Sequence, residues 1–74
     1  MERYRNGNFT CSMEDYNRAK EWVDSHDGDW LENPAWIGKE IGISKWHIIV
    51  GLILKESSEW MKWTRHKNLW VRMR

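Results

Sequence analysis

A short break between two helical stretches constrains the fold of this chain more than any other sequence feature. Asn33 and Pro34 predict a helix start, because asparagine is a favoured N-cap and proline fits the first helical position. This helix, residues 34–41, is expected to end at Gly42. A second helix is expected to begin at once, with Ser44 as its cap and with apolar residues at Ile48, Ile49, Leu52 and Ile53. The two helices are therefore joined by a tight turn.

An earlier helix is predicted to begin at Ser12. Asp15 follows three residues later, which is a variant of the capping box, and acidic side chains suit the positive end of a helix dipole. Apolar residues then recur at helical spacing at Met13, Tyr16 and Val23. Gly28, in the polar stretch 25–29, is expected to lie beyond the helix end.

The segment before Ser12 shows no periodicity, and Asn6-Gly7-Asn8 within it is a turn signal. A chain of 74 residues has room for one hydrophobic core. We therefore expect a loose N-terminal lead-in, residues 1–11, followed by one domain, residues 12–74.

Two segments near the C-terminus predict a β-hairpin. Residues 60–65 and 69–74 are rich in aromatic and β-branched side chains, and residues 65–68 between them form a short basic connection. In the second segment Leu69, Val71 and Met73 alternate with Trp70, Arg72 and Arg74. Residues 29–32 predict one more short extended stretch.

The central region resembles the winged helix-turn-helix family. Gly38 matches the small residue inside the first helix of that motif, and Gly42 matches the glycine of its turn. The flanking apolar positions are filled by Ile37, Ile41, Ile43 and Ile48, whereas Gly51 replaces an expected apolar residue. The resemblance covers about residues 12–74 and implies an α+β fold, a small winged helix-turn-helix with three helices and a C-terminal β-hairpin wing. Two packed helices of an unrelated bundle are the alternative.

Charge is distributed unevenly along the chain, although the net charge is only +1. Residues 1–44 carry five basic and nine acidic side chains, whereas residues 45–74 carry seven basic and two acidic ones. This asymmetry indicates a polyanionic partner for the C-terminal half, or else two faces that are simply solvated differently.

The resemblance implies binding to double-stranded DNA, with the second helix of the motif in the major groove and the wing on the phosphates. The base-facing positions hold no Arg, Asn or Gln, so we expect weak sequence specificity. The protein is expected to act as a small transcription-regulator-like homodimer. Nucleic-acid contacts are expected at Lys45, Trp46, Lys62, Arg65, His66, Lys67 and Arg72.

A protein-interaction module, of cellular, viral or phage origin, is the alternative function. If Ile48 and Leu52 face the core, an apolar surface remains exposed, which monomeric proteins rarely tolerate. The expected interface consists of Trp46, Ile49, Val50, Ile53 and Trp70. Seven tryptophans also exceed what so small a core can enclose. Trp22, Trp63 and Trp36 are expected in the core, and Trp46 and Trp70 at the surface.

Catalysis and cofactor binding are not expected. The chain contains no phosphate-binding glycine loop and no histidine–cysteine–carboxylate cluster at metal-ligand spacing. Cys11 is the single cysteine and has no histidine near it in sequence, so a nucleophilic role is not expected and a reducing cytoplasm fits best. No apolar run reaches the roughly 20 residues of a membrane span, and the N-terminus lacks the apolar stretch of a signal peptide.

Overall fold

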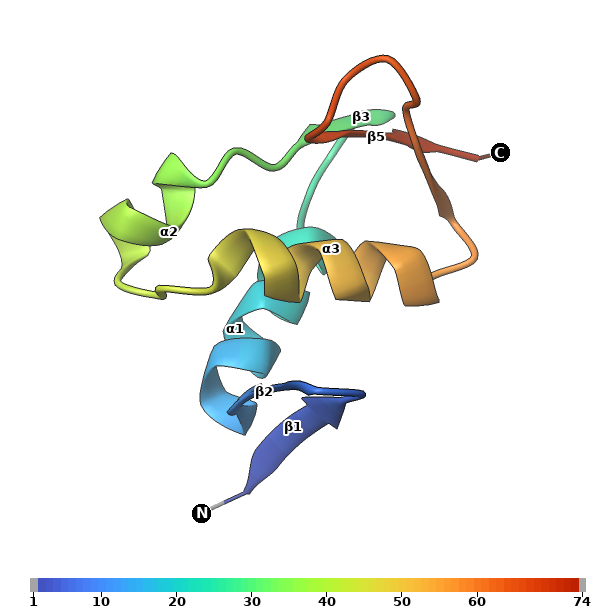
Figure 1. Ribbon diagram of the computed structural model, residues 1–74. Coiled ribbons are helices and arrows are strands. Elements are labelled where there is room, and N and C mark those ends of the chain that lie inside the picture. Colours follow the sequence, from blue (N-terminus) through green and yellow to red (C-terminus); the bar gives the residue numbers. More distant parts are fainter. Residues whose placement is uncertain (1, 74) are drawn as a thin grey trace.

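The computed structural model describes residues 2–73, which form three helices and two antiparallel sheets (Figure 1). The expected α+β class is confirmed. No helix in this part of the chain has the length and apolar character needed to cross a membrane. The elements in chain order are β1 (Arg3–Asn6), β2 (Phe9–Ser12), α1 (Met13–Asp24), β3 (Trp30–Glu32), α2 (Trp36–Ile41), α3 (Trp46–Glu56), β4 (Trp60–Lys62) and β5 (Leu69–Arg72).

The N-terminal segment is a β-hairpin, so the expectation of a loose lead-in over residues 1–11 is wrong for the described part. β1 and β2 pair antiparallel around Gly7, whose positive φ of 60° suits a two-residue hairpin turn. The Tyr4 ring stacks on Tyr16 of α1 at 4.1 Å, and its hydroxyl donates to Glu56 Oε1 at 2.9 Å. The hairpin is thereby tied to α1 and to the end of α3. Four-residue strands are too short to show a clear alternation in sequence.

Helix α1 begins as predicted. The Ser12 hydroxyl accepts a hydrogen bond from the Asp15 N–H at 3.1 Å, which satisfies one of the free donors of the first turn. Ala19 and Val23 are buried on its inner face. Gly28 lies four residues beyond the helix with a φ of 104°.

Helices α2 and α3 cross as closely as the sequence predicts. Gly42 ends α2 in the left-handed conformation, with φ 76° and ψ 25°. A Cβ atom on Gly38 would lie 2.6 Å from the Ile43 carbonyl oxygen and 2.7 Å from Trp46 Cβ. Only glycine therefore allows this approach of α2 to the start of α3.

Both helix starts in this pair differ from the expectation. Asn33 does not cap α2, which begins at Trp36; instead its Nδ2 donates to the His47 carbonyl at 3.0 Å. This bond joins the end of β3 to the first turn of α3. Ser44 does not cap α3 either, because Lys45 occupies the cap position and no side chain bonds to the turn.

The C-terminal strands form a sheet with β3, and β5 lies in its centre. The order is β3-β5-β4, with Trp30 paired to Val71 and Val71 paired to Met61. The predicted alternation in β5 is confirmed, but the side that faces the core is the one that carries Trp70.

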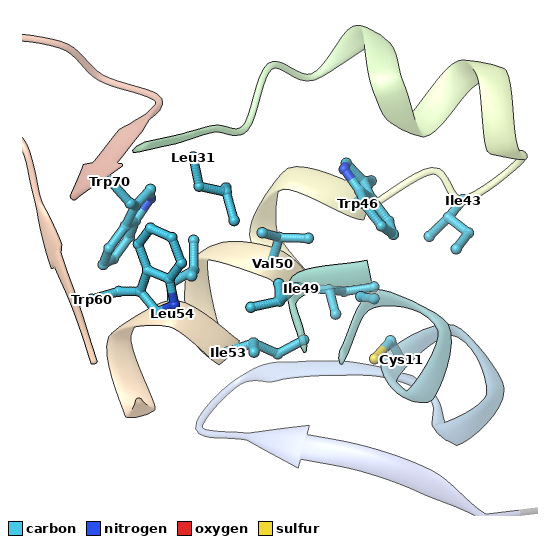
Figure 2. Close-up of a cluster of buried hydrophobic side chains, with 12 residues drawn as sticks. Cys11, Leu31, Ile43, Trp46, Ile49, Val50, Ile53, Leu54, Trp60 and Trp70 are labelled. Atoms are coloured by element: carbon cyan, nitrogen blue, oxygen red, sulfur yellow. The ribbon is translucent and has the colours of Figure 1, made fainter. Parts of the chain in front are cut away.

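The core lies between α1, α3 and the inner face of this sheet (Figure 2). Three tryptophans, Trp46, Trp60 and Trp70, are buried in it, and Trp22 packs against it. The expected core position of Trp22 is confirmed. Four other assignments are wrong, since Trp36 and Trp63 are exposed while Trp46 and Trp70 are buried.

Candidate nucleic-acid interface

Helix α3 buries the side that the sequence interpretation placed at the surface. Trp46, Ile49, Val50 and Ile53 point into the core in Figure 2 and are at most 7% exposed. The exposed interface expected at these residues is therefore wrong, as is that expected at Trp70. The exposed side of α3 carries His47, Ile48, Gly51, Leu52 and Lys55, of which Gly51 and Leu52 are half-buried.

The reason for this shift is that α3 is apolar on nearly every side. Residues 46, 49, 50 and 53 form one helical stripe, and residues 48 and 52 belong to another, so periodicity alone does not choose between them. Trp46 decides the choice, because its ring meets Trp22 edge-on at 5.1 Å and its Cβ lies over Gly38. Burying it turns Ile48 outward.

A groove of about 570 Å³ runs between the exposed side of α3 and β4. Most of its lining side chains are apolar, and the lining also includes Lys55 and Lys62. We call it the α3–β4 groove; it is lined by His47, Ile48, Gly51, Leu52, Lys55, Trp60, Met61, Lys62 and Trp70.

A basic loop, residues 63–68, joins β4 to β5 beside this groove. Arg65, His66 and Lys67 are exposed on it, as predicted for a hairpin tip. Backbone bonds hold the loop in shape: the Trp63 N–H donates to the Leu69 carbonyl at 2.9 Å, and the Asn33 N–H donates to the Asn68 carbonyl at 2.7 Å. His66 Nε2 lies 3.8 Å from Glu32 Oε1, a surface contact that contributes little to stability.

Two predicted contact residues lie away from this cluster. The Lys45 ammonium is 5.5 Å from the centre of the Phe9 ring, on the side of the N-terminal hairpin. The Arg72 guanidinium faces inward, donating to the His26 carbonyl at 3.2 Å and lying 4.6 Å from the centre of the Trp60 ring. Arg72 therefore joins β5 to the segment that follows α1, and its expected nucleic-acid contact stays a prediction. The assignment of Trp46 is wrong for the reason of burial given above.

Sequence interpretation missed the residues of α3 that share the groove with Lys62. Lys55, Ile48 and Gly51 lie three, four and seven residues apart, which places them on one side of a helix. The sequence did carry one signal for this orientation, which is the close approach of the two helices at Gly38. That approach requires Trp46, at the start of α3, to be buried against α2.

The Cys11 thiol is not placed to act as a nucleophile at the surface. Its side chain is buried in the core, and burial raises the pKa of the thiol, with the Asp15 carboxylate adding to the effect. The thiolate is therefore disfavoured at neutral pH, and a thiol in this form is a poor nucleophile. Among residues 2–73 no three His, Cys, Asp or Glu side chains gather as metal ligands would.

Comparison with known proteins identifies no family for this chain. The chain matches no protein-family model, and searches of curated proteins and of solved structures found no significant similarity.

Proposed function

We propose that this protein is a winged helix-turn-helix domain that binds double-stranded DNA, mainly through the phosphate backbone. The element order α1-β3-α2-α3-β4-β5 and the strand order β3-β5-β4 support the proposal. So does the crossing of α2 and α3 over Gly38. In such a domain α3 is the helix that approaches the major groove, and the β4–β5 hairpin is the wing.

The observation that carries the proposal is the grouping of positive charge on one side of the molecule. Lys62 lines both the α3–β4 groove and the hollow of the basic loop, so the two share one cation. Lys55 stands at one end of this surface, and Arg65 and Lys67 at the other. Four cations spread along a helix and a neighbouring hairpin match the repeated charges of a duplex backbone.

Removing the two loop cations should weaken binding to every duplex by a similar factor. We expect Arg65→Ala with Lys67→Ala to lower the affinity roughly tenfold and to reduce the slope of log K against log salt by about 2, from a starting value of about −3 to −4. Fluorescence anisotropy with a labelled 20-base-pair duplex, from 50 to 200 mM salt, measures both quantities.

The matched control removes two cations from another side of the molecule. Arg5 on β1 and Lys20 on α1 are exposed. Both elements lie away from the loop that joins β4 to β5 (Figure 1). Arg5→Ala with Lys20→Ala should leave the salt slope unchanged. The absence of binding at 50 mM salt, or an equal effect of both double variants, would contradict the proposed surface.

Sequence preference, where it exists, should depend on thymine methyl groups. The centre of the exposed side of α3 is Ile48, which is 40% exposed, and it offers an apolar contact but no hydrogen-bond donor to a base edge. An A·T-rich duplex should bind a few-fold more tightly than the same duplex with uracil in place of thymine. Ile48→Ala should remove that difference without changing the salt slope. A thymine–uracil difference that survives in Ile48→Ala would assign the contact to another residue.

A further inference from the structure

The side of the β3-β5-β4 sheet that faces away from the core is apolar and open. Register and alternation place seven residues on it, and we call them the outer sheet face: Trp30, Glu32, Met61, Trp63, Leu69, Val71 and Met73. Trp30 is 56% exposed, Met61 53%, Met73 47% and Trp63 39%. The helices lie on the other side of the sheet (Figure 1), so within residues 2–73 no element covers these side chains.

Two tryptophans form the centre of this face. The rings of Trp30 and Trp63 come from either side of the central strand and approach to 5.8 Å between their centres, at 59° to each other. They lie over β5, where Leu69 and Val71 remain half-buried beneath them. Large aromatic side chains that are held in place but half exposed are typical anchors of protein interfaces.

We propose that the outer sheet face is the interface of a homodimer, in which a second copy of this chain packs on it about a two-fold axis. Two tryptophans and two methionines that are each about half exposed present roughly 400 Å² of apolar surface. A stable interface of standard size buries about 800 Å² on each partner, of which somewhat more than half is apolar. The face therefore supplies most of the apolar area that a dimer of this chain needs.

The charges at the two ends of the sheet favour a second copy over an unrelated partner. Asp27 and Glu59 lie at the end where β3 begins, and Arg65 and Lys67 lie at the opposite end, where Glu32 offsets part of their charge. A two-fold axis that lies between the two sheets, parallel to them and perpendicular to the strands, places the acidic end of one copy over the basic end of the other. The same surface is thus complementary to itself, as a two-fold interface requires.

The dimer can be measured separately from the proposed DNA binding, because its dissociation constant is determined on the protein alone. Lys62 and Trp70, which line the α3–β4 groove, point to the opposite side of the sheet from Met61 and Val71. Met61 nevertheless lines the groove as well as the outer sheet face, and Arg65 and Lys67 belong to both proposed surfaces. Trp30 belongs to the outer sheet face and to neither hollow, so Trp30→Glu tests the dimer alone.

Sedimentation equilibrium of the purified protein tests the interface. We expect a reversible dimer with a dissociation constant below 1 mM, and we expect Trp30→Glu and Met61→Glu each to raise that constant at least tenfold. Trp36→Glu is the matched control, because Trp36 is as exposed as Trp30, at 58%, but lies on α2 outside the sheet. A wild type that is monomeric at 1 mM, or a dimer that only Trp36→Glu disrupts, overturns the proposal.

A measurement on the unmodified chain covers the case in which a variant fails to fold. The indole N–H resonances of Trp30 and Trp63 should shift between 20 µM and 2 mM protein, while that of Trp36 stays constant. Shifts at Trp36 alone overturn the assignment of the face. So does a monomer whose Trp30 and Trp63 resonances move only when single-stranded DNA is added, because the face would then bind nucleobases instead of a second copy.

Discussion

Replacing Gly38 by alanine should destabilise the protein by about 1–3 kcal/mol, because the added methyl group has no space. Its carbon would lie 2.6 Å from the Ile43 carbonyl oxygen and 2.7 Å from Trp46 Cβ. Neither atom is the end of a flexible side chain, so relief requires α2 and α3 to move apart. Urea unfolding followed by tryptophan fluorescence measures the loss.

The control for this substitution is Gly51→Ala. Gly51 also lies within a helix, but a Cβ there meets no atom within 4 Å. Alanine should therefore stabilise α3 by about 0.5–1 kcal/mol, the ordinary advantage of alanine over glycine in a helix. If Gly38→Ala is as stable as Gly51→Ala, the two helices do not cross as described.

Trp46→Ala should cost about 3–5 kcal/mol, the usual loss for removing a large aromatic side chain from a core. Trp46 is 1% exposed and packs edge-on against Trp22. Its indole Nε1 has no hydrogen-bond partner among residues 2–73, so Trp46→Phe loses packing alone and should cost less than Trp46→Ala.

Trp36→Ala is the comparison for Trp46→Ala, because Trp36 is largely exposed and should change stability by less than about 0.5 kcal/mol. Thermal and urea unfolding of the three variants separates the two orientations of α3. If Trp46→Ala lowers the free energy of unfolding by less than about 1 kcal/mol, the Trp46 side chain lies at the surface.

The parts of the fold that sequence predicted are those governed by local chemistry. The Ser12 cap, the left-handed Gly42, the small residue at Gly38 and the alternation in β5 each follow from the residue and its immediate neighbours. The orientation of α3 does not, because a helix with apolar residues on nearly every side is turned by what packs against it. In this protein the packing of Trp46 on Trp22 and over Gly38 sets the orientation of α3.

The same distinction applies to the candidate site. Arg65, His66 and Lys67 were predicted at an exposed tip, because charges in a short connection between strands remain solvated. Arg72 was assigned to DNA by its charge, although alternation puts it on the same side of β5 as Trp70. Because Trp70 is buried, Arg72 also points inward. Its guanidinium lies over the Trp60 ring and donates a hydrogen bond to the His26 carbonyl.

The position of β5 has a consequence for the order in which the protein can fold during synthesis. β5 separates β3 from β4 and follows both in the chain, so neither strand has a sheet partner until residues 69–72 are available. Until then the buried side chains of Leu31 and Trp60 lack Trp70, which lies beside them in the completed core. A nascent chain that ends before β5 therefore exposes these apolar surfaces. We expect this stage of synthesis to be the one most prone to aggregation and most dependent on chaperones.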